Sequence, residues 1–467
     1  MVFAFLYAFL MLIFLMLIGL SYYIPKLINA RKLDANEDVS DKLQQAQNYI
    51  YTGIVFVIVA GIGTTYFATV GTPWEAHLME WLNIVIRLMH ITFGIAWIGA
   101  SFYFVFLENA LNRTENVRDE LAGNLWAVHG GGFYYLEKFK VAPSKIPKHL
   151  HWFKYEAYFT WLSGFCLMFV VYYFNASAFL IDTNVLDISA LQGILIGVGS
   201  FIVAWILYDV LCKSALIKNQ LLFSLIGFAI LVGFAYFYTH VFSSRAAYIH
   251  FGAMVGGLMV ANVFFVIIPA QKAMVKAAKE GLPLNPQLGK NALSRSIHNN
   301  YFTLPVLFVM VSNHFPSTFG YEYPWLILAI ISLGAAGVKH YLNLREKKQK
   351  SVWVMPVSAG ILLAASFISA PPKNPEACNS TIRFADVNSI IQERCVTCHS
   401  SKPTDDFYKV APNGVMYDSP QAIVAKKDLI MQRVVVTKTM PQNNKTNITE
   451  AERDIIRCWI NQGALLE

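Results

Sequence analysis

The sequence predicts an all-α fold, a polytopic membrane bundle of about ten helices followed by a small soluble domain at the C-terminus. Hydrophobic residues make up 56% of the chain and charged residues 14%, a balance too apolar for an ordinary soluble protein. Residues 376–467 differ, because they follow a proline-rich linker at 371–375 and contain no apolar run of spanning length. Ten other segments are long enough, or nearly so, to cross a bilayer: residues 3–22, 49–70, 82–107, 155–176, 190–212, 220–241, 247–270, 299–315, 324–343 and 352–370.

The C-terminal domain contains the pattern Cys395-x-x-Cys398-His399, which is the attachment signature of a covalent c-type haem. In that chemistry the two thiols form thioethers to the porphyrin, and the histidine is the first axial ligand of the iron. Met440, which precedes a proline, is the candidate for the second axial ligand. We therefore expect a soluble class I-like cytochrome c domain that binds haem c through Cys395, Cys398, His399 and Met440.

A short helix is predicted downstream of this methionine. Thr449 and Glu452 have the spacing of a capping box, and Ile455, Ile456 and Trp459 follow at helical spacing. One apolar face of this helix could therefore cover the haem edge.

The alternative to haem is a structural zinc site. Zinc favours four soft ligands, and Cys378 and Cys458 could complete such a set. The histidine directly after the second cysteine and the methionine downstream favour haem instead. We expect Cys378 and Cys458, which flank the motif, to form a disulfide, and such a bond requires an oxidising compartment.

Basic residues predict the orientation of the spans. If haem attachment is periplasmic, ten spans place both the N-terminus and the C-terminal cytochrome domain on that side. Twenty-two lysines and arginines then fall on the five cytoplasmic connections, whereas Arg245 alone falls on the opposite ones. This asymmetry follows the positive-inside rule, so we expect a multi-pass protein of the bacterial inner membrane. The net charge of +8 is spread between apolar segments, so the predicted partner is the lipid bilayer and not nucleic acid.

Four histidines lie near the predicted outer ends of the spans: His90, His240, His250 and His314. Polar side chains within spans are functional candidates because burying them in hydrocarbon is costly. Imidazoles ligate haem and transition metals, so two that face each other, with His90 and His250 as candidates, would hold a b-type haem iron. Arg87, one turn before His90, could neutralise a haem propionate or a substrate anion. The alternatives are satisfied or interfacial histidines and an arginine that snorkels to the membrane surface.

The one long connection, residues 108–154, contains three glycines directly after His129. Glycine-rich loops can bind phosphate, but no Gly-Lys-Ser/Thr follows this one. We expect a turn with close backbone approach.

Six stretches of the chain carry a family resemblance: Glu80-Trp-Leu-Asn-Ile-Val-Ile-Arg87-Leu-Met-His90, Ile95-Ala-Trp97-Ile-Gly99-Ala-Ser-Phe-Tyr-Phe, Asn124-Leu-Trp126-Ala-Val-His129-Gly-Gly-Gly-Phe-Tyr, His151-Trp-Phe-Lys-Tyr-Glu156, Trp161-Leu-Ser-Gly164 and Ser312-Asn313-His314. Together with the C-terminal motif, they resemble the bacterial membrane-bound, cytochrome c-fused urate hydroxylase (urate oxidase) family over roughly residues 80–467. In addition, His90-x6-Trp97-x-Gly99 is similar to small membrane haem b proteins of the protoporphyrinogen oxidase type, which supports a ligand role for His90.

The resemblance implies an eight-span membrane domain, residues 73–370, joined by the linker 371–375 to a cytochrome c domain, residues 376–467. Residues 1–72 are an additional transmembrane hairpin about which the resemblance says nothing. The family oxidises urate to 5-hydroxyisourate and passes the electrons to the respiratory chain instead of making hydrogen peroxide.

Urate hydroxylation removes two electrons, whereas one haem c accepts them singly. The haem therefore turns over twice, or a second cofactor such as a b haem lies between. We expect the urate anion to enter from the periplasmic side near Arg87 and His90. His250 and His314 are the candidates for the catalytic base, and water supplies the oxygen.

Two other functions remain open. The chain could be a membrane-anchored electron-transfer cytochrome or respiratory-complex subunit without substrate chemistry of its own. It could also be a transporter with an appended redox sensor, although the sequence shows neither an internal repeat nor paired broken helices.

Overall fold

The structure is a computed structural model that describes residues 2–33, 37–69, 72–143, 145–147, 150–370, 378 and 380–466. The predicted linker, residues 371–375, lies outside the described residues. The chain forms two compact units, residues 1–84 and 85–467. The α-helices and strands are α1 (Val2–Leu33), α2 (Glu37–Thr69), α3 (Pro73–Ala110), β1 (Leu121–His129), β2 (Gly132–Phe139), α4 (Tyr155–Leu167), α5 (Ala176–Phe179), α6 (Ala190–Lys213), α7 (Gln220–Thr239), α8 (Ser244–Ala261), α9 (Ile268–Glu280), α10 (Pro286–Ser312), α11 (Pro324–Glu346), α12 (Val354–Ile368), α13 (Phe384–Arg394), α14 (Pro420–Ala425), α15 (Lys427–Ile430) and α16 (Glu450–Asn461). Shorter π and 3-10 segments are η1 (Met168–Tyr173), η2 (Ala215–Lys218), η3 (Asn262–Ile267), η4 (Pro316–Thr318), η5 (Pro412–Gly414), η6 (Met431–Val436) and η7 (Gln442–Asn444).

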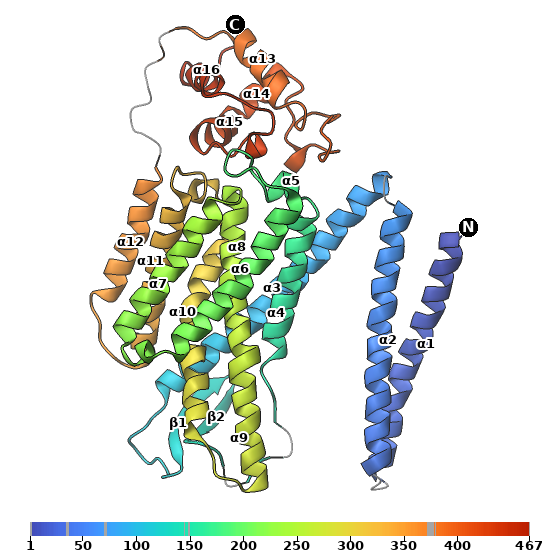
Figure 1. Ribbon diagram of the computed structural model, residues 1–467, viewed down its shortest axis with the longest axis vertical. Coiled ribbons are helices and arrows are strands. Elements are labelled where there is room, and N and C mark those ends of the chain that lie inside the picture. The colour runs from blue at the N-terminus through green and yellow to red at the C-terminus, as the bar shows by residue number, and fades with distance from the viewer. Residues whose placement is uncertain are drawn as a thin grey trace. The chain divides into compact units, whose positions relative to one another are not determined.

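In the first unit, α1 and α2 lie side by side (Figure 1). Ile24 and Ile28 of α1 pack against Ile50 of α2 in a small apolar cluster. Phe56 and Val59 of α2 stay exposed, as side chains that face lipid would be. This pair of helices corresponds to the N-terminal hairpin that the sequence predicts.

Six helices of the described chain are long and apolar enough to cross a membrane: Lys42–Thr69, His77–Ala110, Ala190–Lys213, Gln220–Thr239, Ser244–Glu280 and Pro324–Glu346. Two shorter apolar helices, Ile13–Asn29 and Val354–Ile368, coincide with the first and tenth predicted spans. The other two predicted spans fall on α4, which is 13 residues long before it continues as η1, and on α10, whose first half is polar. The number of ten spans therefore stays a prediction.

In the second unit, α8 is the central helix of a bundle and packs against α4, α6, α7 and α10. Many of its side chains are buried; Ala246, Ala247 and Phe251 are at most 3% exposed. Gly252 allows α10 to approach closely, because a Cβ atom there would lie 2.5 Å from Val309. This close packing fixes the rotation of α8 about its axis.

The connection between α3 and α4 forms a β-hairpin, so the all-α prediction misses two strands. Strand β1 pairs with β2 in antiparallel register from Leu121 opposite Phe139 to His129 opposite Gly132. Gly130 and Gly131 make the turn with φ values of 57° and 80°, a left-handed conformation that favours glycine. The predicted glycine turn is thus confirmed. The segments on either side of it form strands because the turn places their aromatic-rich sequences opposite each other.

Two helices of the bundle change to π-helical winding partway along. α4 continues as η1, and α8 continues as η3 and then α9. A π turn inserts an extra residue and rotates the side chains that follow it. In α4 this winding turns Tyr172 and Tyr173 into the core, where each is 4% exposed.

The C-terminal region, residues 380–466 with Cys378, has an apolar core of its own. Ile456 and Trp459 of α16 pack there against α13, so the predicted apolar face covers α13 instead of lining the cavity described below. The predicted capping box is confirmed, since the side chains of Thr449 and Glu452 each accept a hydrogen bond from the other's backbone amide.

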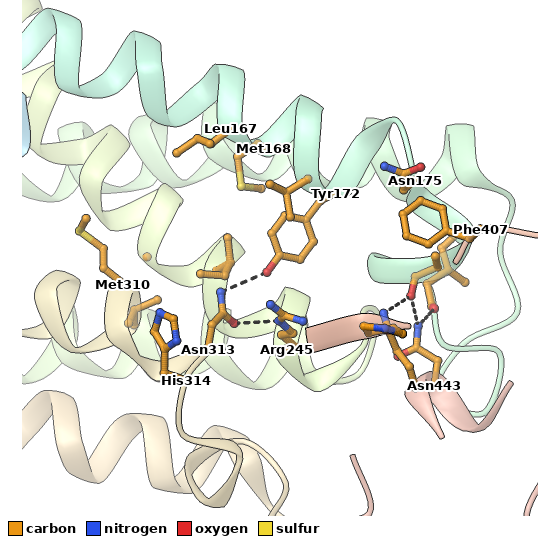
Figure 2. Close-up of a pocket in the computed structure, with 18 of the residues that line it drawn as sticks. Leu167, Met168, Tyr172, Asn175, Arg245, Met310, Asn313, His314, Phe407 and Asn443 are labelled. Atoms are coloured by element: carbon orange, nitrogen blue, oxygen red, sulfur yellow. Dashed lines mark hydrogen bonds between the residues drawn. The ribbon is translucent and has the colours of Figure 1, made fainter. Parts of the chain in front are cut away.

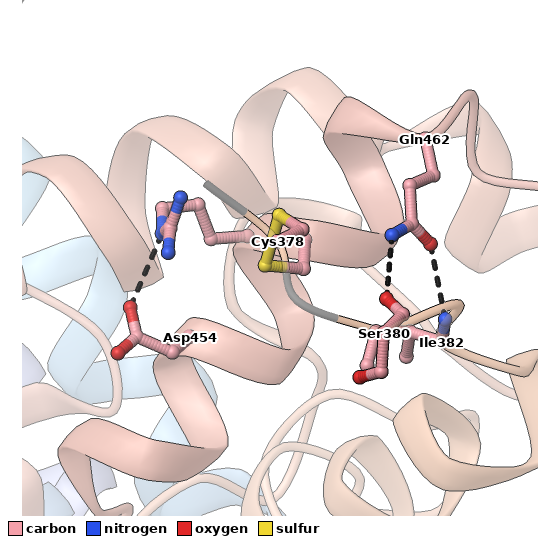
Figure 3. The surroundings of a disulfide bond; sticks show 7 residues. Cys378, Ser380, Ile382, Asp454 and Gln462 are labelled. Carbon is pink, nitrogen blue, oxygen red and sulfur yellow. Dashed lines mark hydrogen bonds and ion pairs between the residues drawn. A yellow bond between two sulfur atoms is a disulfide. The ribbon is translucent and has the colours of Figure 1, made fainter. Parts of the chain in front are cut away.

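The predicted disulfide between Cys378 and Cys458 is also present (Figure 3). Beside it, the Gln462 side chain donates to the Ser380 carbonyl (2.8 Å) and accepts from the Ile382 amide (3.0 Å). These bonds hold the start of the C-terminal region against α16.

Candidate functional site

One large cavity in the second unit, of about 1420 Å³, is lined by residues of both the bundle and the C-terminal region. We call the part formed by α3, α4, α8, α10 and their adjoining segments the bundle half, and the part formed by residues 394–447 the C-terminal half. Of the predicted site residues, the bundle half contains Arg87, His90 and His314. The C-terminal half contains Cys395, Cys398, His399 and Met440. Seven of the eight predicted residues therefore face one space.

His90 is held by α4 in a defined tautomer. Its Nδ1 lies 2.9 Å from the main-chain oxygen of Thr160 and 3.3 Å from Ser163 Oγ. Because a carbonyl oxygen can only accept, Nδ1 carries the proton and Nε2 keeps its lone pair. Gly164 makes room for the ring, since a Cβ atom there would lie 2.8 Å from His90 Cε1. The ring is thus oriented so that Nε2 can act as a base or as a ligand.

A hydrogen-bonded chain of three side chains crosses the bundle half (Figure 2). Arg245 Nε donates to Asn313 Oδ1 (3.3 Å), and Asn313 Nδ2 donates to the Tyr172 hydroxyl (3.3 Å). The three residues come from α8, the end of α10 and η1, and all line the cavity. Arg87 lines the same half of the cavity, so this half contains two arginines.

His314 follows this chain at the end of α10 and lines the cavity with an exposed side chain (Figure 2). It therefore remains a candidate for binding substrate or for proton transfer.

His250 departs from its expected place, because it does not line the cavity. The side chain is fully buried, with Nδ1 2.8 Å from the Ala246 carbonyl and Nε2 3.1 Å from the Tyr173 hydroxyl. Both ring nitrogens are thus occupied, which leaves no lone pair for an iron or for a substrate proton. The predicted pairing of His90 with His250 around a b haem does not fit this arrangement. The rotation of α8, which its packing against α10 sets, explains the difference.

His240 also lies outside the cavity. Its Nδ1 contacts the Tyr236 carbonyl at 2.7 Å, and its ring stacks on Tyr236 with centroids 3.9 Å apart. It is the C-cap residue of α7.

In the C-terminal half, the residues of the haem signature converge on the cavity. His399 Nδ1 donates to the Val415 carbonyl (2.9 Å), which leaves its Nε2 lone pair available to an iron. Met440 is tied to Arg433, because the Met440 amide donates to the Arg433 carbonyl (3.0 Å). Cys395 and Cys398 line the same wall. The donor set, two thiols with one imidazole and one thioether, fits a covalent haem c.

The zinc alternative fits less well. Cys378 and Cys458 are joined to each other and cannot complete a zinc site. Among the described residues, no group of three or more His, Cys, Asp or Glu side chains is arranged to hold a metal ion.

Positive charge dominates the lining of this cavity. Among the described residues that line it, five are cationic: Arg87, Arg245, Arg394, Arg433 and Lys445. Asp406 is the one carboxylate in that lining. Arg394 pairs with Glu452 (3.0 Å) and Lys445 with Asp405 (2.5 Å), so part of this charge is neutralised behind the wall. We expect an anion to occupy a cavity with this lining.

Asp405 anchors the loop behind this wall. Burial acts to raise the pKa of its carboxyl group, but the hydrogen bond from Lys445 and those from the Tyr408 and Phe407 amides lower that pKa to about 2. The carboxylate therefore stays ionised and holds the loop that carries Phe407 and Tyr408.

The loop that follows Met440 contacts the bundle directly. The Asn443 side-chain amide donates to the main-chain oxygens of Ala178 (3.0 Å) and Ile181 (2.7 Å). Gln442 Nε2 also donates to the Ala178 carbonyl (2.6 Å). The candidate axial-ligand loop is therefore fastened to α5 and to Ile181, which follows it.

Sequence reasoning missed Tyr172, Asn313 and Arg245 as residues of the site. Asn313 stands beside His314 in one of the resembling stretches, and Arg245 is the single basic residue on the predicted outer connections, so both carried a signal. Tyr172 carried none, because it lies among other aromatic residues of an apolar segment.

Comparison with known proteins places this geometry in a family. Residues 76–370 match the family described as Urate oxidase N-terminal. The chain belongs to the Urate oxidase N-terminal family. No curated protein and no solved structure matches it. The family match runs from α3 to α12, so it covers the whole bundle half, whereas the C-terminal half lies beyond it.

Proposed function

We propose that the chain is a membrane-bound oxidoreductase that oxidises urate to 5-hydroxyisourate and passes the electrons through a covalent haem c to a respiratory-chain acceptor. The observation that carries this proposal is the single cavity, in which His90 and Arg87 share one space with Cys395, Cys398 and His399. Membership of the Urate oxidase N-terminal family supports an oxidation that acts on urate. The shared cavity supports direct transfer between the substrate and the C-terminal half.

The proposed reaction balances without molecular oxygen. Urate and one water give 5-hydroxyisourate, two protons and two electrons, and the water oxygen becomes the new hydroxyl group. Arg87 holds the urate anion, and the amide and hydroxyl groups of Asn313 and Tyr172 offer partners for its ring carbonyls and N–H groups.

His90 is the proposed general base. Its Nε2 lone pair would accept the proton that the attacking water loses, while the Thr160 carbonyl stabilises the imidazolium through Nδ1–H. His314 is the second candidate, because it lines the same half of the cavity. His250 is no longer a candidate, since both of its nitrogens have partners.

Cys395, Cys398, His399 and Met440 would hold the haem. When bound, haem c would supply a one-electron acceptor, so that two electrons leave in succession. Because the cavity is continuous, we propose no b haem between substrate and haem c. A pyridine haemochrome spectrum of the purified protein tests this point, and a b-type band would contradict it.

The apolar helices support a location in a membrane, and we propose the bacterial inner membrane with the C-terminal region in the periplasm. The disulfide between Cys378 and Cys458 supports an oxidising compartment for that region. Protease accessibility of the C-terminal region in sealed spheroplasts tests this orientation, and protection from external protease would contradict it.

The experiment that tests the activity follows urate and haem together. Membranes that contain the chain are incubated with urate without oxygen, while urate absorbance and the reduced haem c band are recorded. We expect urate loss and haem reduction in a ratio of one urate to two electrons. Haem reduction by quinol with no loss of urate would instead identify an electron carrier without substrate chemistry.

A further inference from the structure

Two arginines from different parts of the second unit face the same cavity. Arg245 belongs to α8 of the bundle, and Arg433 belongs to η6 of the C-terminal region. In the described part of the chain, neither guanidinium forms an ion pair with a carboxylate. Both arginine side chains are half-buried in the wall of the cavity that also contains the residues of the haem signature.

Contacts on both sides hold Arg245 at this junction. Its Nε donates to Asn313, and its guanidinium lies over the Phe179 ring, 5.9 Å from the centroid. Phe179 packs edge-on against Phe407 of the C-terminal region, with ring centroids 5.3 Å apart. Arg245 is thus oriented by residues that also join the C-terminal region to the bundle.

Arg433 is connected to the candidate axial ligand. Its carbonyl accepts the hydrogen bond from the Met440 amide, so its backbone position and that of Met440 are coupled. Two half-buried cations that line one cavity without a carboxylate partner are unfavourable unless an anion binds them. Planar guanidinium groups bind carboxylates with paired hydrogen bonds, which makes a carboxylate the best-matched anion.

We propose that Arg245 and Arg433 form a clamp, one arginine from each part, for the two propionate carboxylates of haem c. This inference rests on the proposed function, because it requires the haem. The clamp directs the propionate edge of the haem toward the bundle half of the cavity. It also makes docking of the C-terminal region depend on the haem, since one arginine of the clamp belongs to each part. Neutralised propionates favour the reduced iron, so the clamp raises the midpoint potential.

The test is a redox titration of haem c in the full-length protein, with the variants Arg433→Gln and Arg245→Gln. We expect each to shift the one-electron reduction equilibrium about tenfold toward the oxidised state, which corresponds to a midpoint potential lower by about 59 mV. Arg245→Lys keeps the charge and should recover most of that potential. Arg383→Gln is the matched control, because Arg383 pairs with Asp386 on the surface and does not line the cavity.

Covalent haem staining is measured first for every variant. If the wild-type protein shows no covalent haem, the proposed function fails. If wild-type and variant proteins stain equally but the variants keep the wild-type potential, the clamp is wrong. An increase in the KM for urate at an unchanged potential would also overturn it, and would assign Arg245 to the substrate anion. If Arg245→Gln does not accumulate, Arg433→Gln and Arg245→Lys still decide the outcome.

Discussion

The two halves of the cavity position their imidazoles in the same way but surround them with different groups. His90 in the bundle half and His399 in the C-terminal half each donate Nδ1–H to a backbone carbonyl at 2.9 Å and leave Nε2 with a lone pair. With His399 in the C-terminal half lie the sulfur atoms of Cys395, Cys398 and Met440. With His90 in the bundle half lie arginines, an amide and a phenol. The backbone hydrogen bond thus sets the tautomer in both halves, and the neighbouring side chains suit the proposed iron ligation in one half and the proposed proton transfer in the other.

His250 sharpens this comparison within the bundle. It also donates Nδ1–H to a backbone carbonyl, and it also packs against a glycine, Gly197, of a neighbouring helix. Its Nε2, however, is bonded to Tyr173 instead of opening onto the cavity. Burial and depth in the bundle therefore do not separate His90 from His250, whereas the partner of the second ring nitrogen does.

The largest expected effect on urate oxidation comes from a substitution at His90, which changes the bundle half of the cavity and leaves the C-terminal half intact. His90→Gln removes the proposed base, so urate oxidation should fall at least about 100-fold while covalent haem staining stays intact. Urate consumption by membranes, normalised to haem c content, measures this. Cys395→Ala, in contrast, should abolish covalent haem staining, because it removes one of the two thiols that would attach the haem.

His250→Gln is the matched control for the bundle half. It should lower thermal stability, because Tyr173 loses its partner, but leave most of the urate oxidation per haem. Equal loss of activity in both histidine variants would show that the comparison between them does not hold.

The next effect concerns the C-terminal half alone. Asp405→Asn should destabilise that region by about 2 kcal/mol, because a buried carboxylate with a pKa of about 2 loses its bond to Lys445. Since the folded-state pKa lies below the ordinary value of 3.8, this stabilisation is complete above that value and is lost as the pH falls from about 4 toward 2. Denaturant unfolding followed by haem absorbance measures it.

Asp386→Asn, which breaks an exposed ion pair, should change the stability by less than about 0.5 kcal/mol. If the asparagine variants at positions 405 and 386 unfold alike at every pH, the anchoring role assigned to Asp405 is wrong.

A smaller effect tests how the bundle half orients its imidazole. Gly164→Ala places a methyl group against the His90 ring and should lower urate oxidation about tenfold by displacing Nε2. Gly94→Ala is the control, because its methyl group would meet only Thr160 at 3.9 Å, an ordinary contact. Steady-state rates on urate distinguish them, and identical rates would mean that the ring tolerates the shift.

The smallest effect lies in the contact between the halves. Asn443→Gly removes two hydrogen bonds to the bundle yet suits the left-handed backbone at this position, where φ is 51°. Each such bond contributes about 1 kcal/mol, so urate-dependent haem reduction should slow severalfold. Stopped-flow absorbance measures the rate. Asn116→Gly, also at φ 51° but in the loop before β1, should leave it unchanged.

Local features of the chain were predictable because few residues set them. The capping box at Thr449, the glycine turn after His129 and the disulfide partners of the C-terminal region each follow from spacing or composition over a short stretch or a flanking pair. The strands β1 and β2 were not predicted, since their aromatic residues become a sheet only when the turn pairs the two segments. The apolar segments likewise locate helices, but length alone does not separate α4 and α10 from the six long ones.

By itself, the sequence determined the haem signature, the apolar helices and the positions of its candidate histidines along them. Only the tertiary structure decided that His90 opens onto the cavity while His250 does not, and that Tyr172, Asn313 and Arg245 meet beside it. The physical reason is rotation. Hydropathy places a residue along a helix axis, whereas the direction in which its side chain points depends on how neighbouring helices pack, and that packing is set by residues distant in the chain.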